Sequence, residues 1–290
     1  MPRLDWTRDG IDWPNRAASR FVGAGGVTWH VQQLGAGPVA LLVHGTGAST
    51  HSWRDLARSL AKSFTVVAAD LPGHAFTSSP ATSAGYSLRG MTTALGSLLH
   101  ALAVVPELAI GHSAGAAILA RMCLDGSIAP RRLVAVNPAL LPLHGIRGRV
   151  FSPAAKLLAG NDLVSRVVSW RAADRAVIER LLASIGSQLD SVGVDLYARL
   201  ARSPAHVAAA LRMMANWDLV ALARELPQLA SKLVLVAGAR DRAISPAVSR
   251  RIGERVPAAP LLWLQNVGHL APEERPDEVA EIAMRSHACV

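Results

Sequence analysis

Gly111-His112-Ser113-Ala114-Gly115 is the stretch of sequence that decides the fold. A short apolar run at 107–110 precedes it, and an Ala-rich run with helical spacing follows it at 114–125. This order predicts a strand, then a sharp turn with a serine at its apex, then a helix. A G-x-S-x-G turn in that setting is typical of a nucleophile elbow, whose strained backbone projects the serine hydroxyl beyond the end of a sheet. Glycines flank the serine because side chains would collide where strand and helix meet.

Short apolar runs alternate with helical patterns along most of the chain. Expected strands lie at 20–22, 27–34, 39–43, 65–69, 108–111, 133–136, 232–237 and 261–264. Expected helices lie at 53–62, 87–103, 114–125, 246–255 and 276–286. Gly25-Gly26 between the first two strands indicates a hairpin. The alternation predicts an α/β fold with a mostly parallel eight-stranded sheet, helices on both faces and a ligand site at the carboxyl ends of the strands.

The alternation breaks between residues 140 and 226, where helical patterns occur without a convincing strand. We therefore predict a core made of residues 1–139 and 227–290 and an inserted helical cap, or lid, at 140–226. Apolar side chains of this cap, together with one residue of the elbow, are predicted to line a substrate pocket: His112, Trp170, Met213, Met214 and Trp217. The alternative for the cap residues is that they form the core of the cap itself.

A serine hydroxyl needs a histidine to take its proton and an acid to orient that histidine. Asp241 follows the strand at 232–237, and His269 follows the strand at 261–264, so both belong to the same sheet edge as Ser113. We predict Ser113 as nucleophile, His269 as base and Asp241 as acid, in hydrogen-bond contact with one another. The alternatives are an ordinary loop aspartate and a structural histidine. Other acids could serve instead, namely Asp218, Glu273 and Glu274, whereas Asn137 occupies a suitable position but is an amide.

Acyl transfer also creates an oxyanion, which backbone N–H groups must hold. One donor is expected from Ala114, the residue after the nucleophile. The second is expected from the loop after the strand at 39–43, which reads His44-Gly45-Thr46-Gly47, and we assign it to Thr46. The alternative for this loop is a plain tight turn.

The composition excludes several classes of protein. The 290 residues are 51% hydrophobic and carry a net charge of +9, and only three of the 30 basic residues are lysines. The arginines are scattered without a long basic block, which argues against nucleic-acid binding. No apolar run approaches the roughly 20 residues that span a bilayer. The two cysteines lie far apart and no metal-ligand pattern occurs, so we expect no metal, no cofactor and a cytoplasmic location, in solution or peripheral to a membrane.

The order of these motifs, together with Asp70-Leu-Pro-Gly73, resembles the α/β-hydrolase superfamily over about residues 19–288. The sequence departs from many relatives at Ala75, where they carry a second glycine. A serine nucleophile in place of an aspartate argues against dehalogenase and epoxide-hydrolase chemistry. The resemblance therefore implies a serine hydrolase of the esterase type.

A narrower resemblance rests on the stretches 13–16, 19–22, 29–32 and 44–54, which read WPNR, SRFV, WHVQ and HGTGASTHSWR. They are similar to the BchO family, regarded as magnesium-chelatase accessory proteins of bacteriochlorophyll biosynthesis in photosynthetic bacteria. This resemblance implies a role around magnesium insertion into protoporphyrin, with the metal as cargo of the pathway, but it supplies no reaction. A cap with tryptophan, methionine and surplus arginine suits a large apolar ligand with two carboxylates.

Three classes of function follow. The first is a hydrolase of an ester, such as an ester of a tetrapyrrole or its precursor. The second is a non-catalytic porphyrin-binding or delivery protein, and the third is an interaction subunit that contacts magnesium chelatase subunits. A complete serine, aspartate and histidine set favours the first, because a binding protein has no physical need for all three.

Overall fold

The computed structural model describes residues 1–142, 162–172, 174–229 and 233–288. Its centre is one eight-stranded sheet with the spatial order β1-β2-β4-β3-β5-β6-β7-β8. The strands are β1 (Ser19–Ala24), β2 (Val27–Leu34), β3 (Val39–Val43), β4 (Thr65–Ala69), β5 (Pro106–His112), β6 (Arg132–Val136), β7 (Leu233–Gly238) and β8 (Leu261–Leu264). Strand β2 is antiparallel to both of its neighbours, β1 and β4, whereas β3 to β8 are all parallel to one another. The predicted mostly parallel sheet is confirmed.

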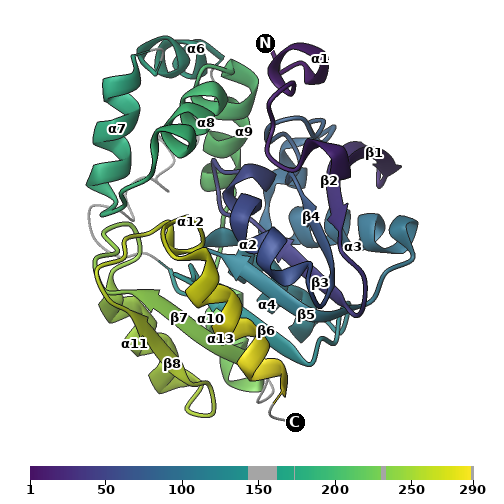
Figure 1. Cartoon of the computed structure of the whole chain (residues 1–290), viewed down its shortest axis with the longest axis vertical. Helices are drawn as coiled ribbons and strands as arrows, with labels where there is room; N and C mark the ends of the chain where they lie inside the picture. Colours follow the sequence, from purple (N-terminus) through teal and green to yellow (C-terminus); the bar gives the residue numbers. More distant parts are fainter. Residues whose placement is uncertain (143–161, 173, 230–232, 289–290) are drawn as a thin grey trace.

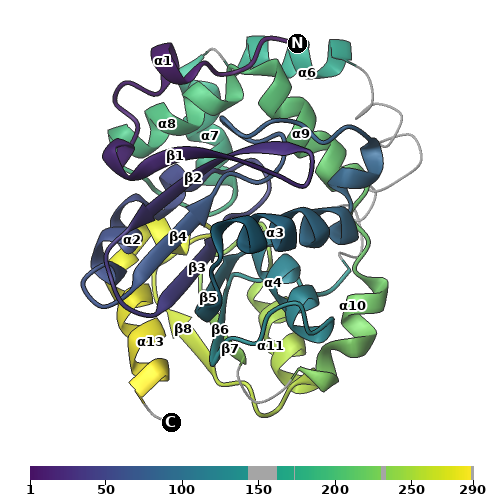
Figure 2. The same ribbon diagram turned by 90° about the vertical axis from the view of Figure 1, so that its right-hand side faces the viewer.

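Helices cover both faces of this sheet (Figures 1 and 2). One face carries α2 (Arg54–Leu60) and α13 (Pro276–Ala288), and the other carries α3 (Leu88–Leu102), α4 (Ala114–Leu124) and α11 (Pro246–Arg255). The strands between them read as continuous apolar runs because both of their faces are buried.

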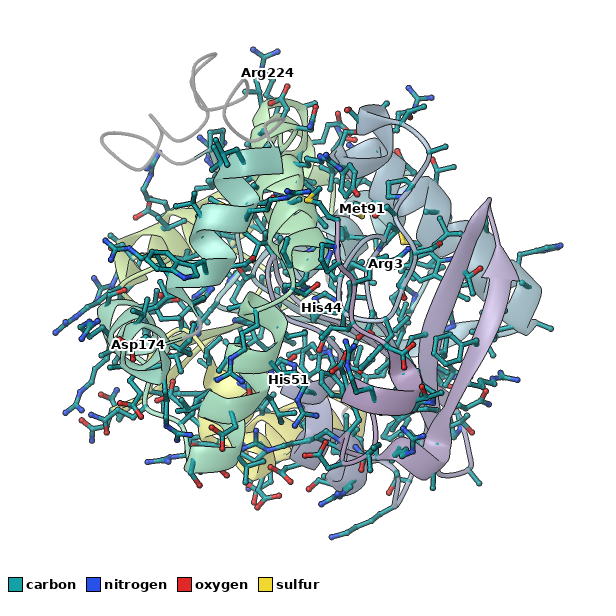
Figure 3. All side chains as sticks on the ribbon, turned by 90° about the horizontal axis from the view of Figure 1, so that it is seen from above. Arg3, His44, His51, Met91, Asp174 and Arg224 are labelled. Carbon is teal, nitrogen blue, oxygen red and sulfur yellow. The ribbon has the colours of Figure 1, made fainter. Side chains whose placement is uncertain are left out.

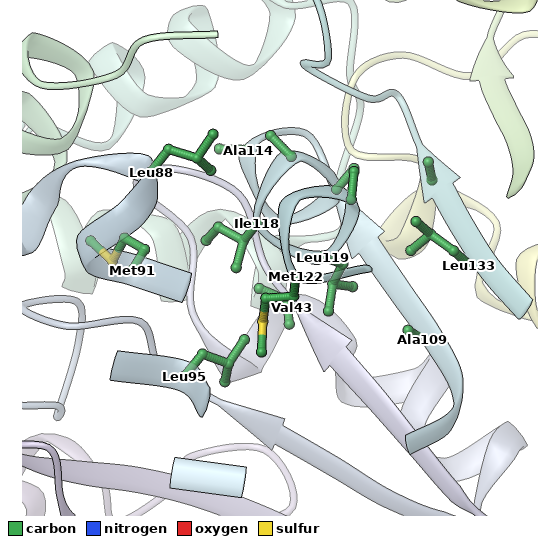
Figure 4. Packing of buried hydrophobic residues seen from close by; sticks show 14 of the residues in the cluster. Val43, Leu88, Met91, Leu95, Ala109, Ala114, Ile118, Leu119, Met122 and Leu133 are labelled. Carbon is green, nitrogen blue, oxygen red and sulfur yellow. The ribbon is translucent and has the colours of Figure 1, made fainter. Parts of the chain in front are cut away.

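Alternate residues of a central strand serve opposite sides of the sheet. In β3, Leu41 and Val43 pack with the cluster under α3 and α4, while Leu42 packs with the cluster under α2 and α13. Figure 4 shows the first cluster, where Ile118 and Met122 of α4 lie over the sheet. These buried layers fix the position of α4 and therefore of the turn that precedes it.

Five described helices lie between β6 and β7 in the sequence, and those from α6 to α9 gather at one end of the molecule (Figure 1). They are α6 (Asp162–Arg171), α7 (Arg175–Ser184), α8 (Ser191–Ala201), α9 (Pro204–Ala215) and α10 (Val220–Glu225). The inserted helical cap is thus confirmed, while its limits at 140 and 226 as a separate domain stay a prediction, since 143–161 fall outside the described residues.

The N-terminal segment, residues 1–18, lies against the cap. Trp13 is buried and packs with Phe76 and with Leu196 and Leu200 of α8. The remaining short elements are α1 (Trp6–Asp9), α12 (Ala271–Glu274) and the 3-10 turns Arg16–Ala18, Thr50–Trp53, Ser83–Tyr86 and Leu226–Gln228. Within the described residues, no helix combines the length and apolarity that crossing a bilayer requires.

Candidate active site

The turn after β5 holds Ser113 in a strained conformation. Its φ of 52° and ψ of −115° lie in a region that residues other than glycine rarely adopt. The backbone is fixed on both sides, because the Ser113 N–H donates to the Val136 carbonyl at 3.0 Å and the Ser113 carbonyl accepts from the Ala139 N–H at 3.1 Å. The hydroxyl does not cap α4 and has no hydrogen-bond partner among the described residues. It therefore lies unused by the fold.

The two glycines of the motif are required by close backbone contacts. A Cβ atom on Gly115 would overlap the carbonyl oxygen of Val43, and one on Gly111 would lie 2.5 Å from Cα of Ala116. Real Cβ atoms do not approach that closely, so a side chain at either position would push α4 away from the sheet. The steric reason given from the sequence therefore holds in the structure.

Asp241 and His269 come together at the carboxyl ends of β7 and β8. The distance from His269 Nδ1 to Asp241 Oδ2 is 2.8 Å. The other carboxylate oxygen accepts from the N–H groups of Ala243 and Ile244 at 2.7 and 2.9 Å, which holds the carboxylate in place. Because a carboxylate only accepts, Nδ1 carries a proton, and in the neutral ring the lone pair is then on Nε2. This arrangement is the one that a general base requires.

Ser113 and His269 line one cavity. No hydrogen bond joins their side chains within the described part of the chain, so the predicted direct contact stays a prediction. Such contacts are often loose in the absence of a substrate. The competing acids accept hydrogen bonds from groups other than the His269 side chain: Asp218 from the Val220 N–H, Glu273 from the Tyr197 hydroxyl and Glu274 from the Gly268 N–H.

The loop that carries His269 is held by Asn137, which follows β6. The Asn137 amide nitrogen donates to the carbonyls of Gly268 and His269 at 2.9 and 2.7 Å, and its oxygen accepts from the Gly238 N–H at 2.7 Å. Asn137 is 1% exposed and has a φ of 44°, a conformation that asparagine tolerates. In the sequence, Asn137 stands out only as an amide where an acid could sit, and no local pattern indicates this contact.

His112, the residue before the serine, supports the same loop. Its Nε2 lies 2.8 Å from the His269 carbonyl oxygen, to which it donates. Burial and the neighbouring His269 hold the pKa of His112 well below its usual value, so its imidazole is neutral. His112 also lines the cavity, and its predicted contact with a substrate stays a prediction.

The loop from His44 to Ala48, called the oxyanion loop below, follows β3. The Gly45 carbonyl accepts from the Ala48 N–H at 3.2 Å and from His44 Nδ1 at 2.7 Å, and His44 Nε2 accepts from the Leu71 N–H at 2.9 Å. Burial lowers the pKa of His44. Figure 3 shows His44 near the centre of the molecule when it is seen from the cap side.

The N–H of Thr46 belongs to the same peptide as the Gly45 carbonyl and points the opposite way, because the peptide is trans. Neither the Thr46 N–H nor the Ala114 N–H has a hydrogen-bond partner among the described residues, and both residues line the cavity. Two unpaired donors beside a serine are what an oxyanion requires.

The cavity has a volume of about 640 Å³ and a largely apolar lining. Its cap side includes Leu181, Leu182, Ile185, Tyr197, Met214 and Trp217. Two predicted pocket residues are not part of it. Trp170 is 73% exposed on α6, and Met213 is fully buried with its sulfur 3.5 Å from Thr46 Oγ1. Successive helical residues point about 100° apart, so α9 turns Met214 but not Met213 toward the cavity.

The charge of the cavity differs from the expectation. Among the described lining residues, Asp218 is the one acidic residue, and none is an arginine or lysine. The predicted pairing of cap arginines with ligand carboxylates therefore has no support in this part of the chain. No cluster of three or more histidine, cysteine or acidic side chains in the described ranges is arranged to hold a metal ion.

A buried polar cluster beside the cavity connects cap and core. The Tyr197 hydroxyl of α8 donates to Glu273 at 2.8 Å, Arg54 lies 3.6 Å from the same carboxylate, and Arg54 also binds Asp190 at 2.8 Å. Burial raises the pKa of Glu273 to about 7. This cluster places a titrating carboxyl group four residues after His269.

Comparison with known proteins agrees with this architecture. A model of the alpha/beta hydrolase family matches residues 40–282. The magnesium-chelatase 30 kDa subunit of Rhodobacter capsulatus is 38% identical over 268 residues, which cover 92% of this chain and 93% of that protein. A pimeloyl-[acyl-carrier protein] methyl ester esterase of Xanthomonas oryzae is 27% identical over 288 residues, with 90% and 99% of the two chains covered.

Two solved structures share the fold. An alpha/beta hydrolase fold protein from Burkholderia ambifaria superposes with a TM-score of 0.75 and 22% identity, covering 92% of this chain and 97% of its own. The epoxide hydrolase CorEH superposes with a TM-score of 0.78 and 22% identity, covering 93% and 98%. At such identities the likeness concerns the fold alone.

Proposed function

The chain belongs to the alpha/beta hydrolase family, as its sequence predicts, and on that premise we propose that it is a serine hydrolase that cleaves an ester. The observation that carries the proposal is that His269, joined to Asp241 at 2.8 Å, lines one cavity with a strained Ser113 whose hydroxyl the fold leaves unused. Serine at this position supplies an acyl-forming nucleophile.

In the proposed reaction, His269 Nε2 takes the hydroxyl proton of Ser113 while Ser113 Oγ attacks the ester carbonyl. The carbonyl electron pair moves to oxygen, and the N–H groups of Thr46 and Ala114 hold the resulting oxyanion. The pair then returns, the bond to the leaving alcohol breaks, and His269 donates its proton to that alcohol. Water repeats the sequence on the acyl-serine and releases the acid. Asp241 keeps the His269 proton on Nδ1 throughout.

The substrate that we propose is a neutral ester with a large apolar part. The apolar lining favours such a group, and the absence of arginine and lysine from its described portion disfavours a free carboxylate. The Rhodobacter relative is named as a magnesium-chelatase subunit, and the Xanthomonas relative is named as a methyl ester esterase. We therefore propose an ester of a tetrapyrrole or its precursor, in the cytoplasm or at a membrane surface, near the step of magnesium chelation.

A second candidate is a non-catalytic porphyrin-binding or delivery protein, or an interaction subunit, for magnesium chelatase. The name of the Rhodobacter relative favours this candidate, since a chelatase subunit need not hydrolyse anything. The apolar cavity suits a bound porphyrin as well as an ester of one.

The turnover of an activated p-nitrophenyl ester tests hydrolysis. We expect Ser113→Ala to lower kcat by on the order of 10⁴-fold or more, because only binding and oxyanion stabilisation remain. Ser97→Ala is the matched control, since Ser97 lies on α3 and bonds only within its own helix. Complementation of a deletion strain separates the candidates: pigment synthesis restored by Ser113→Ala would favour delivery over hydrolysis.

A further inference from the structure

His206 of cap helix α9 binds the oxyanion loop from the cap side. It is 3% exposed, and both ring nitrogens have backbone partners in the core. Its Nδ1 accepts from the Ala75 N–H at 2.9 Å, and its Nε2 lies 3.1 Å from the Gly47 carbonyl oxygen. The Ala75 N–H can only donate, so Nδ1 is unprotonated and Nε2 donates to Gly47.

The tautomer is fixed in a neutral ring. Burial lowers the pKa of His206 to about 4, so the imidazole is uncharged at neutral pH. The ring meets the His74 ring edge-on at 5.2 Å between ring centres. Asp70, the acidic group that acts on His206, is already bound by His30 and by backbone N–H groups. A single neutral tautomer therefore satisfies both backbone partners at once.

The contact with Gly47 bears on the expected oxyanion donor. Gly47 directly follows Thr46 and has a φ of 77°. Because glycine adopts many backbone conformations, the peptide group that carries the Gly47 carbonyl can rotate unless a contact holds it. The Gly45 carbonyl is held from the core side by His44 and Ala48. His206 holds the Gly47 carbonyl two residues further on, so the loop is anchored on both sides of Thr46.

Further residues on the same face of α9 pack against the oxyanion loop. Ala210, four residues after His206, lies 4.0 Å from the place of a Cβ on Gly47, and Met213, seven residues after His206, accepts from Thr46 Oγ1 at 3.5 Å. Residues spaced by four and seven lie on one side of a helix. Ala75 adds strain at the other end, because its φ of 40° is unusual for a residue with a side chain.

We propose that His206 is a positioning residue that sets the Thr46 N–H from the cap through the Gly47 carbonyl. This inference rests on the proposed hydrolase function, since it gives that N–H a role in the reaction. It implies that a displaced cap would leave the oxyanion site incomplete, while substrate binding through the apolar cavity would change little.

Two substitutions separate the two contacts of His206. Asparagine places an acceptor where Nδ1 lies and has no donor that reaches Gly47, whereas glutamine places a donor where Nε2 lies. We expect His206→Asn to lower kcat for a p-nitrophenyl ester roughly 10- to 100-fold, less than the complete loss of an oxyanion donor, with KM within about twofold. We expect His206→Gln to keep kcat within about threefold of the wild type. His100→Asn, on the exposed end of α3, is the control.

The outcomes are distinguishable from those of the proposed function. A wild type without Ser113-dependent turnover overturns the function and this inference together. An active wild type in which both His206 variants lose kcat equally, or in which KM alone changes, overturns only the role of His206. If the variants do not fold, the imidazole ¹⁵N and ¹H resonances of the wild type give a second test. Phosphonylation of Ser113 places an oxygen in the oxyanion site, and we expect it to shift the His206 Nε2–H resonance; an unchanged resonance overturns the proposal.

Discussion

Replacement of Asn137 by alanine tests whether one amide holds the loops of the candidate acid and base together. The Gly238 N–H and the Gly268 carbonyl each lose their amide partner, while the His269 carbonyl keeps His112. A buried backbone group left unpaired costs about 1–3 kcal/mol. Alanine at a φ of 44° adds about 1 kcal/mol. We therefore expect the free energy of unfolding to fall by about 3–7 kcal/mol.

Urea denaturation followed by tryptophan fluorescence, with linear extrapolation to water, measures this loss. Asn137→Gly is the matched control for backbone strain, because glycine adopts a positive φ freely. We expect it to be more stable than Asn137→Ala by about 1 kcal/mol, with the hydrogen-bond loss unchanged. A loss below about 1 kcal/mol in the alanine variant would refute the reasoning, since the three contacts would then carry no net free energy.

Three further predictions concern the candidate site. Asp241→Asn should leave the fold intact and lower kcat for an activated ester about 10⁴-fold, because an amide does not hold the His269 tautomer; steady-state kinetics measures this, and a loss below tenfold contradicts it. Gly115→Ala should lower the melting temperature by at least about 5 °C through overlap with the Val43 carbonyl, whereas Gly96→Ala, which has open space, should not. Glu273 has a raised pKa of about 7, so the folded protein binds its proton more tightly than the unfolded chain; relative to Glu273→Gln, wild-type stability should fall by about 3 kcal/mol as pH rises from 4.5 to above 7, and parallel stability curves would exclude this titration.

The parallel strands of the core could be predicted from the sequence almost to the residue. The strand expected at 39–43 is β3, and the helix expected at 246–255 is α11. Strands buried on both faces must be continuously apolar, and the breaks between them carry turn residues, so their limits are visible locally. The position of β2 beside β4 has no such local signal, because pairing between distant strands depends on the whole sheet.

The candidate site was predictable where the chemistry defines the residue type. Ser113, Asp241 and His269 stand at the ends of strands in an order that the sequence displays. His206 and Asn137 were not predictable as contacts, because their partners are backbone groups of segments remote in the chain. A polar residue that binds a distant carbonyl leaves no periodicity or motif behind.

The cap was the least predictable part. Its helices are amphipathic, but the pattern alone does not say which apolar side chains face the cavity, which face solvent and which face the interior of the cap. Met213 and Met214 are neighbours on α9, and only the orientation of that helix on the core decides that Met214 lines the cavity while Met213 does not. Trp170 is apolar yet exposed. Cap orientation is set by contacts such as those of His206 and Tyr197, which appear only once the chain is folded.

Covalent labelling by a fluorophosphonate is the measurement that tests the central claim most directly. The reagent forms a stable bond with a serine only where a base activates the hydroxyl and N–H donors hold the phosphoryl oxygen. We expect intact-mass spectrometry of the folded protein to show one adduct, mapped to Ser113, that does not form in Ser113→Ala or in protein unfolded in urea before the reagent is added. An unlabelled wild type, or an adduct that persists in Ser113→Ala, would contradict the assignment of Ser113 as nucleophile.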